Sequence, residues 1–352
     1  MSNTQSRLTH VQSLVQPRQV LVLFSAAQIC AVTGAELSTE DREGLVCITS
    51  TACYFFCSPL FAPKKSTGVT IDILAKKNLE AFFTACSESG KDTLLYDPTT
   101  LTCSELTWLQ ERAPSLVCTA ETELFTHTLW TKKTKQELAA CRAAGKLSLK
   151  IMEAVCASLA VGDTELAVAL RIKRALLENG AAPSFPPIVA FGKNTAVVHH
   201  TPTQSQLTAE SPVLIDLGAR LNACCADMTR TIWFGKRPSK LFVSLQERVL
   251  RSTEAAVLAA QTTPTHGAAI DAAARESIVK DGYGEAFIHS TGHGLGFAVH
   301  ERPHIGPTSK DPVVAGQCIT IEPGIYLSGK MGYRHEDTYT LTERGTCISY
   351  TS

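Results

Sequence analysis

Residues 211–235, SPVLIDLGARLNACCADMTRTIWFG, carry a strong structural signal. Two apolar runs flank a short polar centre, which predicts two antiparallel strands joined by a tight turn. We place the centre of the turn between Leu221 and Asn222. Asp216 and Asp227 then face each other across the hairpin, with both side chains on one face. Because two opposed carboxylates repel each other strongly, this pair requires a cation or a proton.

Residues 317–341, QCITIEPGIYLSGKMGYRHEDTYTL, repeat this arrangement. With the turn centred on Gly329, Glu322 and Glu336 are opposed. Arg334 lies on the same face as Glu336, where it could neutralise surplus negative charge or bind a substrate carboxylate. A single acidic residue in a strand is usually a solvated edge position. Acidic residues are poor strand formers, so two such pairs inside apolar segments favour a chemical role.

Eight of the ten histidines lie at or after residue 199. Glycines flank His293, so the backbone there can approach a ligand closely, and a neutral imidazole is a good metal ligand. The stretch 300–304 matches the HExxH zinc-protease pattern, but Pro303 is incompatible with the helix that this pattern needs. We interpret four further histidines as packing or surface residues, namely His200, His266, His304 and His335.

The first third of the chain predicts a small α/β domain. Short apolar runs at 19–24 and 45–56 indicate strands, and 71–85 indicates a helix. We expect this domain to cover residues 1–128 and a second domain to cover residues 129–352.

The second domain shows the same order of elements twice. Two helical patterns precede each carboxylate hairpin, which suggests two related helix-helix-hairpin units. The four predicted helices cover 136–159, a segment with Asp163 as N-cap and Gly180 as its end, 241–261 and about 267–280.

The overall composition points to a soluble protein of about two domains. Lys plus Arg and Asp plus Glu both number 33, so the zero net charge makes nucleic acid or an anionic membrane an unlikely partner. The 13 cysteines are an odd number in a long chain, and the polar start is not a signal peptide. We therefore expect a reduced, cytoplasmic protein.

The order of five candidate ligands resembles the signature of the pita-bread dinuclear metallopeptidases, the family of Xaa-Pro aminopeptidases, prolidases and methionine aminopeptidases. The five are Asp216, Asp227, His293, Glu322 and Glu336. The resemblance covers roughly residues 130–352. It also includes GKNTAVVHH, HSTGHGLGFAVHE, TIEPGIY and YRHEDTYTLTERG. It implies an α+β fold, with a pita-bread catalytic domain after a smaller α/β domain similar to creatinase N-terminal domains.

The resemblance also implies two divalent metal ions per chain. Four carboxylates and one imidazole suit Mn²⁺ best, with Co²⁺, Fe²⁺ or Zn²⁺ as alternatives. By resemblance, Asp227 and Glu336 bridge the ions, Asp216 holds one, and His293 with Glu322 holds the other. A metal-activated hydroxide would be the nucleophile. Glu322 is the candidate for accepting its proton.

Three further histidines have roles implied by the resemblance. His300 and His199 are candidates for binding the scissile carbonyl or stabilising the oxyanion, and His289 for lining a proline pocket. The alternative is that each only orients the ligand shell. With Arg334, these histidines complete the expected substrate-binding residues.

The implied activity is hydrolysis of the bond preceding proline, releasing the N-terminal residue from Xaa-Pro peptides. One alternative is a prolidase restricted to Xaa-Pro dipeptides. Others are a methionine aminopeptidase and a pita-bread module that binds peptides without catalysis. The resemblance also implies a homodimer.

Overall fold

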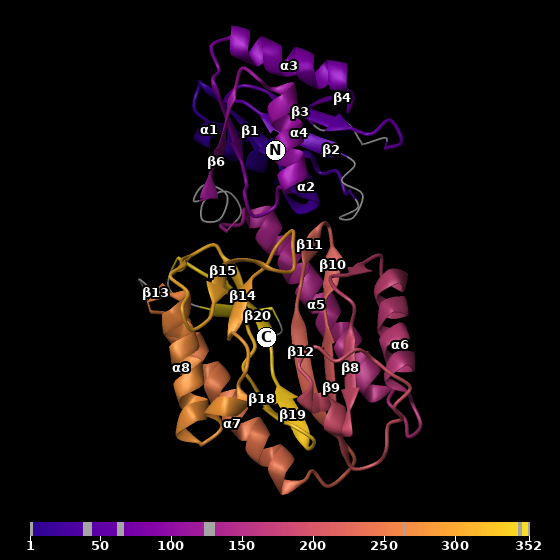
Figure 1. Cartoon of the computed structure of the whole chain (residues 1–352). Helices are drawn as coiled ribbons and strands as arrows, with labels where there is room; N and C mark the ends of the chain where they lie inside the picture. Colours follow the sequence, from indigo (N-terminus) through magenta and orange to yellow (C-terminus); the bar gives the residue numbers. More distant parts are fainter. Residues whose placement is uncertain are drawn as a thin grey trace. The chain divides into compact units, whose positions relative to one another are not determined.

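The structure is a computed structural model that describes residues 3–37, 44–61, 67–122, 131–262, 265–343 and 347–350. The chain divides into two compact units, Met1–Trp130 and Thr131–Ser352 (Figure 1). The expected boundary between residues 128 and 129 falls outside the described residues. Within the described ranges, no helix is both long and apolar enough to cross a membrane.

The first unit is built on a mixed six-stranded sheet in the order β4-β3-β2-β1-β5-β6. Along β1, Leu21 and Leu23 pack into one apolar cluster, and Val20 and Val22 into another. Successive side chains of a strand point to opposite faces, so both faces of this sheet are covered. Its elements are α1 (Asn3–Leu14), β1 (Gln19–Leu23), α2 (Ala26–Thr33), β2 (Gly44–Ile48), β3 (Cys53–Cys57), β4 (Thr70–Ile73), α3 (Lys76–Glu88), β5 (Thr93–Tyr96), α4 (Cys103–Arg112) and β6 (Val117–Ala120).

Two predicted elements of this unit need correction. The apolar run 45–56 is two strands, β2 and β3, joined by a short turn. The predicted helix 71–85 begins as strand β4 and becomes helical only at Lys76. Parallel pairing of β4 with β3 explains the strand, because that tertiary contact overrides local helix propensity.

The first half of the second unit places two helices on a set of antiparallel strands. The helix α5 packs on β10, β11 and β12, and α6 packs on β7 and β8. The sheets have the orders β12-β9-β8 and β11-β10-β7. The elements are α5 (Lys135–Ala157), α6 (Glu165–Glu178), β7 (Ala182–Pro183), β8 (Ile188–Phe191), the 3₁₀ turn η2 (Gly192–Ala196), β9 (Ser211–Leu217), β10 (Ala219–Leu221), β11 (Cys224–Cys225) and β12 (Met228–Phe234).

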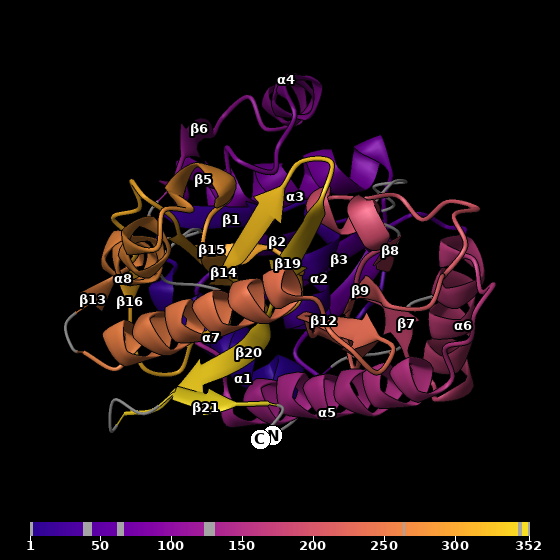
Figure 2. The same ribbon diagram turned by 90° about the horizontal axis from the view of Figure 1, so that it is seen from below.

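The second half repeats this plan with its own apolar cluster. A five-stranded sheet, β15-β14-β17-β20-β21, adjoins the hairpin β18-β19. Figure 2 shows the two long helices of this unit, α5 in the first half and α7 in the second. The elements are α7 (Lys240–Ala260), β13 (Thr265–His266), α8 (Gly267–Lys280), η3 (Gly284–Ala286), β14 (Gly292–Gly294), β15 (Glu301–Ile305), β16 (Pro312–Val313), β17 (Cys318–Ile321), β18 (Gly324–Leu327), β19 (Met331–Arg334), β20 (Asp337–Leu341) and β21 (Cys347–Ser349).

The predicted N-cap of α6 is wrong by one residue. Thr164 has extended backbone angles, and its side chain accepts the hydrogen bond from Ala167 N. The carboxylate of Asp163 instead pairs with Arg171. A hydroxyl at the cap position satisfies the helix, so the Asp163 carboxylate is available for Arg171, about two turns further on.

Candidate metal centre

The first carboxylate hairpin has a register two residues away from the expected one. Thr229 pairs with Asp216, so the direct opposition of Asp216 and Asp227 is wrong. The turn residues are Asn222 and Ala223, with φ angles of 51° and 65°. Left-handed angles at both positions are what a type I′ two-residue hairpin turn requires. A shift of two residues preserves the alternation of faces, so the expected shared face is unaffected.

Asp227 lies just before β12, where the chain passes very close to Gly218. A Cβ atom at residue 218 would lie 1.9 Å from the carbonyl oxygen of Ala226, so only glycine permits this approach. The hydroxyl of Thr338 donates to the carbonyl of Asp227 at 2.9 Å. The position of Asp227 is thus fixed by contacts on both sides.

The register predicted for the second hairpin is confirmed. Ile321 pairs with Asp337, and Gly324 pairs with Arg334, so Glu322 and Glu336 lie between two paired segments. At the acidic positions the strands separate and bond to other neighbours. Glu322 N donates to the Thr291 carbonyl at 2.8 Å, and Glu336 N donates to the Thr229 carbonyl at 3.2 Å. The two side chains therefore lie where different strands meet.

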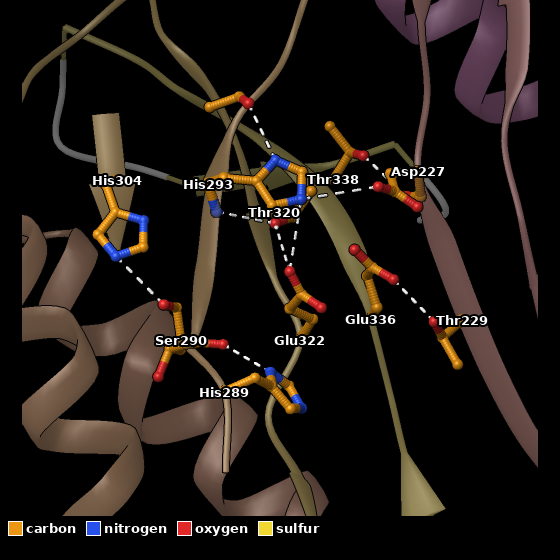
Figure 3. Close-up of polar contacts among 12 residues, drawn as sticks. Asp227, Thr229, His289, Ser290, His293, His304, Thr320, Glu322, Glu336 and Thr338 are labelled. Carbon is orange, nitrogen blue, oxygen red and sulfur yellow. Dashed lines mark hydrogen bonds and ion pairs between the residues drawn. The ribbon is translucent and has the colours of Figure 1, made fainter. Parts of the chain in front are cut away.

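Three of the candidate ligands form a compact group (Figure 3). One ligand atom from each of Asp227, His293 and Glu336 lies within 4.8 Å of the others. His293 Nε2 is 3.7 Å from Asp227 Oδ2 and 3.4 Å from Glu322 Oε1. His293 Nδ1 lies 3.0 Å from the carbonyl of Gly294, so a proton on Nδ1 leaves the Nε2 lone pair facing the carboxylates.

Arg334 connects Asp216 to this group. Its side chain is 2% exposed, and NH2 donates to Asp216 Oδ2 at 2.6 Å. Nε donates to Thr229 Oγ1, which in turn donates to Glu336 Oε2 at 2.7 Å. NH1 donates to the hydroxyl of Tyr326 at 2.9 Å. These bonds support the charge-neutralising role expected for Arg334, and its role in substrate binding stays a prediction.

Burial and mutual repulsion strongly perturb the carboxylates. Burial, and then the charges of Glu336, Asp216 and Glu322, raise the pKa of Asp227 well above its usual value. Burial and the charges of Glu322 and Asp216 do the same to the pKa of Glu336. For Glu322, burial outweighs the opposing charge of Arg334 and raises the pKa to about 8. Burial also raises the pKa of Asp216, although Arg334 opposes it.

The hydrogen bonding of the buried carboxylate oxygens shows whether this cluster could hold metal ions. Among the described residues, none donates a hydrogen bond to three of these oxygens, namely Oδ1 of Asp216, Oδ1 of Asp227 and Oε1 of Glu336. Buried polar atoms in folded proteins normally have partners. Hard oxygen donors with one imidazole nitrogen suit Mn²⁺ and similar divalent ions. The residues therefore fit divalent cations.

The three histidines of expected substrate roles lie around this cluster. The ring centroids of His300 and His293 are 4.5 Å apart. Burial lowers the pKa of His300, with a further contribution from the charge of His199. His289 Nε2 lies 2.8 Å from the Tyr326 hydroxyl, and burial lowers the pKa of His289 to about 4. The structure thus brings His199, His289 and His300 near the carboxylates, while their roles stay predictions.

The HExxH match at residues 300–304 does not form the helical zinc site that this pattern describes. Residues Glu301–Ile305 form strand β15, and His304 Nε2 lies 3.1 Å from Ser290 Oγ (Figure 3). His266 caps α8 by accepting from Ala269 N. His200 and His335 contact the acidic side chains of Glu165 and Asp337.

Two residues of the cluster were missed by the sequence interpretation. Thr229 links Arg334 to Glu336, and Tyr326 links Arg334 to His289. A signal existed for Thr229, which lies two residues after Asp227 on an alternating strand. None existed for Tyr326, whose apolar neighbours are typical of a core strand.

Three comparisons with known proteins agree on one family. The model of metallopeptidase family M24 matches residues 139–343. A Xaa-Pro dipeptidase of Pyrococcus furiosus is 37% identical over 214 residues, which are 60% of this chain and 61% of that protein's length. A Mycoplasma genitalium protein named "Putative Xaa-Pro aminopeptidase" is 32% identical, over 74% of this chain and 72% of its own length.

The solved structure of a Xaa-Pro dipeptidase from Bacillus anthracis superposes with a TM-score of 0.88 at 26% identity, covering 99% of this chain and 98% of that one. The expected α+β pita-bread fold is confirmed by this similarity.

Proposed function

The chain belongs to metallopeptidase family M24, and we propose that it hydrolyses the peptide bond preceding proline and releases the N-terminal residue of Xaa-Pro peptides. The observation that carries this proposal is the buried group of four carboxylates and one imidazole, in which three carboxylate oxygens accept no hydrogen bond from the described residues. Such a site is costly to bury without cations.

We assign two divalent ions to this group, with Mn²⁺ preferred and Co²⁺, Fe²⁺ or Zn²⁺ as alternatives. When bound, such ions lower the pKa of a water molecule and polarise the scissile carbonyl. The proposed ligands are Asp216, Asp227, His293, Glu322 and Glu336. Arg334 neutralises part of their charge through Asp216.

Glu322 is the proposed proton carrier. In the metal-free site burial raises its pKa to about 8, and bound cations would lower that pKa, which leaves this carboxylate ionised and able to accept a proton at neutral pH. Hydrolysis before proline requires proton delivery, because the amine must be protonated before it leaves.

His300 and His199 are proposed to bind the scissile carbonyl and the oxyanion. Burial lowers the pKa of His300, so its ring is neutral at pH 7 and can donate one N–H. His289 is proposed to line the proline pocket. Its ring lies nearly perpendicular to that of Phe287, with 5.2 Å between the centroids, so an aromatic side chain packs beside it.

A prolidase restricted to dipeptides is the second candidate, because similar proteins carry both dipeptidase and aminopeptidase names. A comparison of release rates from Xaa-Pro and Xaa-Pro-Xaa by the Mn²⁺-reconstituted protein separates them. We expect cleavage of both. Activity on the dipeptide alone would reject the aminopeptidase proposal.

The same assay tests the remaining alternatives. Cleavage of Met-Ala peptides with no action on Xaa-Pro peptides would establish a methionine aminopeptidase. Protein that binds no divalent ion after reconstitution, with Asp227→Ala equal to wild type, would favour a binding module. We also expect a cytoplasmic protein that forms a homodimer, and light scattering of the purified protein would test the dimer.

A further inference from the structure

Glu165 is a fully buried carboxylate outside the proposed metal ligands. It is the first residue of α6, and its side chain is 0% exposed. Its oxygens accept hydrogen bonds from the last residue of β8 and from the loop between β8 and β9. The donors are Phe191 N at 2.9 Å, Asn194 Nδ2 at 2.8 Å, His200 Nε2 at 2.8 Å, Thr203 N at 3.0 Å and Thr203 Oγ1 at 2.6 Å.

These bonds keep Glu165 charged. Burial alone would raise its pKa, but hydrogen bonds from His200, Thr203, Asn194 and the backbone of Phe191 outweigh burial, so the pKa lies below its usual value. The amino-terminal end of α6 also favours a negative charge at this position. One carboxylate therefore binds the end of β8 and three residues of the loop that follows it.

The same loop carries His199, one of the proposed substrate-binding residues. The His199 ring is exposed, and no described residue forms a hydrogen bond with it in the structure. Its position therefore depends on the backbone on either side. Val198 offers its carbonyl to Arg334 NH1 at 3.4 Å, and His200 bonds to Glu165. The residues before and after His199 are thus each held by a buried charged side chain.

A second contact holds the start of the loop to the second half of the unit. Thr195 Oγ1 accepts from Gly332 N at 2.9 Å, and Gly332 lies in β19, the strand that carries Arg334. Removing the Glu165 carboxylate would release His200 and the Thr203 hydroxyl, while the bonds of Thr195 to Gly332 N, of Val198 to Arg334 and of the Thr203 carbonyl to Leu166 N remain. Loss of Glu165 should therefore displace His199 more than the metal ligands.

We propose that Glu165 is a positioning residue that holds the 191–203 loop so that His199 meets the substrate carbonyl. This inference rests on the proposed function and assigns a role to a residue with no contact to the proposed ligands. Misplacement of a catalytic contact by about 1 Å can lower a rate about 100-fold. Glu165 therefore acts on turnover through His199.

The test is a double-mutant cycle of Glu165→Gln and His199→Ala in the Mn²⁺-loaded chain of 352 residues. We expect Glu165→Gln to lower kcat/KM for an Xaa-Pro peptide about 10- to 100-fold. In the His199→Ala background the same change should lower kcat/KM less than about twofold, because the group it positions is absent. Multiplicative losses would overturn the proposal, since a general structural effect acts independently of His199.

Asp163→Asn is the matched control. Asp163 lies two residues earlier, and its carboxylate pairs with Arg171 without contacting the 191–203 loop. We expect it to leave kcat/KM unchanged. A loss equal to that of Glu165→Gln would assign the effect to the start of α6 in general and reject a specific role.

Hydrogen exchange separates failure of this proposal from failure of the proposed function. Glu165→Gln should raise exchange in peptides covering 192–203 but not in those covering 287–305, and Asp163→Asn should change neither. Unchanged exchange at 192–203 would reject the anchoring role even in an active enzyme. A wild-type protein inactive on Xaa-Pro peptides would instead reject the proposed function, whatever the exchange shows.

Discussion

The negative charge of Asp227 is strongly disfavoured in the metal-free site, because this residue is buried beside three other carboxylates. Its raised pKa has burial as the main cause and the neighbouring charges as the second. Without metal, the repulsion between these carboxylates can be reduced only if some of them hold protons. Divalent cations neutralise the repulsion at higher pH, where the carboxylates are ionised. The pH and the metal should therefore have linked effects on the free energy of unfolding.

We expect the metal-free protein to lose stability as the pH rises from 6.5 to 8. The folded pKa of Glu322 is about 8, above the unfolded value of about 4.5, so the folded state retains protons that the unfolded state has lost. Each such proton contributes a loss of about 1 kcal/mol per pH unit. Denaturant unfolding at the two pH values, with and without Mn²⁺, measures this effect.

The pH range for this prediction starts at 6.5, because below that pH two buried histidines make stability change with pH in the opposite direction. Burial lowers the pKa values of His289 and His293 to about 4, so falling pH favours the unfolded state between 6.5 and 4. Metal-free protein that is more stable at pH 8 than at 6.5 would contradict the carboxylate account.

Arg334 should matter more for stability than any exposed arginine. Arg334→Met leaves Asp216 buried without its cation, which should cost about 3–5 kcal/mol. The control is Arg174→Met, because the Arg174 and Glu178 side chains are 80% and 59% exposed. Denaturant unfolding should show nearly no change for the control. Equal effects of both variants would refute the role of Arg334.

At the scale of elements, the helices of the second unit follow closely from the sequence. The predicted 136–159, 241–261 and 267–280 correspond to α5, α7 and α8 within two residues at each end. Apolar periodicity and the following glycine or polar residues are local signals, which explains this agreement. The first hairpin was placed less well, because no glycine marks the left-handed turn positions.

We expect Ala223→Gly to stabilise the first hairpin. Ala223 has φ 65°, a left-handed conformation that costs a residue with a Cβ about 1 kcal/mol. Glycine should recover about 1 kcal/mol of unfolding free energy, measurable by denaturant titration. Ala167→Gly, on the exposed face of α6, is the control and should instead destabilise by about 0.5–1 kcal/mol. Loss of stability in Ala223→Gly would argue against this turn.

At the scale of the whole molecule, the proposed ligands come from both halves of the second unit. Asp216 and Asp227 belong to the first half, and His293, Glu322 and Glu336 to the second. Each half has its own apolar cluster. The bonds between Thr229 and Glu336, and between Arg230 and Asp337, join the halves at the site. Cations bound there would add to these links.

Metal should therefore stabilise the second unit selectively. The first unit has its own apolar clusters, so calorimetry of the metal-free chain should show two transitions. Mn²⁺ at about 100 times its Kd adds about 2.7 kcal/mol, which should move one transition by about 5–10 °C. Asp227→Ala should abolish this shift. An equal shift of both transitions would contradict selective stabilisation.

The pairing of Glu322 with Glu336 could be predicted from sequence because it is local. A short turn closes the hairpin, and the two-residue period of a strand then assigns every side chain to a face. The bond from Arg334 to Asp216 could not be predicted in this way, because it joins residues 118 positions apart. Long-range packing of the two halves creates that contact. The same packing excludes water from the carboxylates and so produces their raised pKa values.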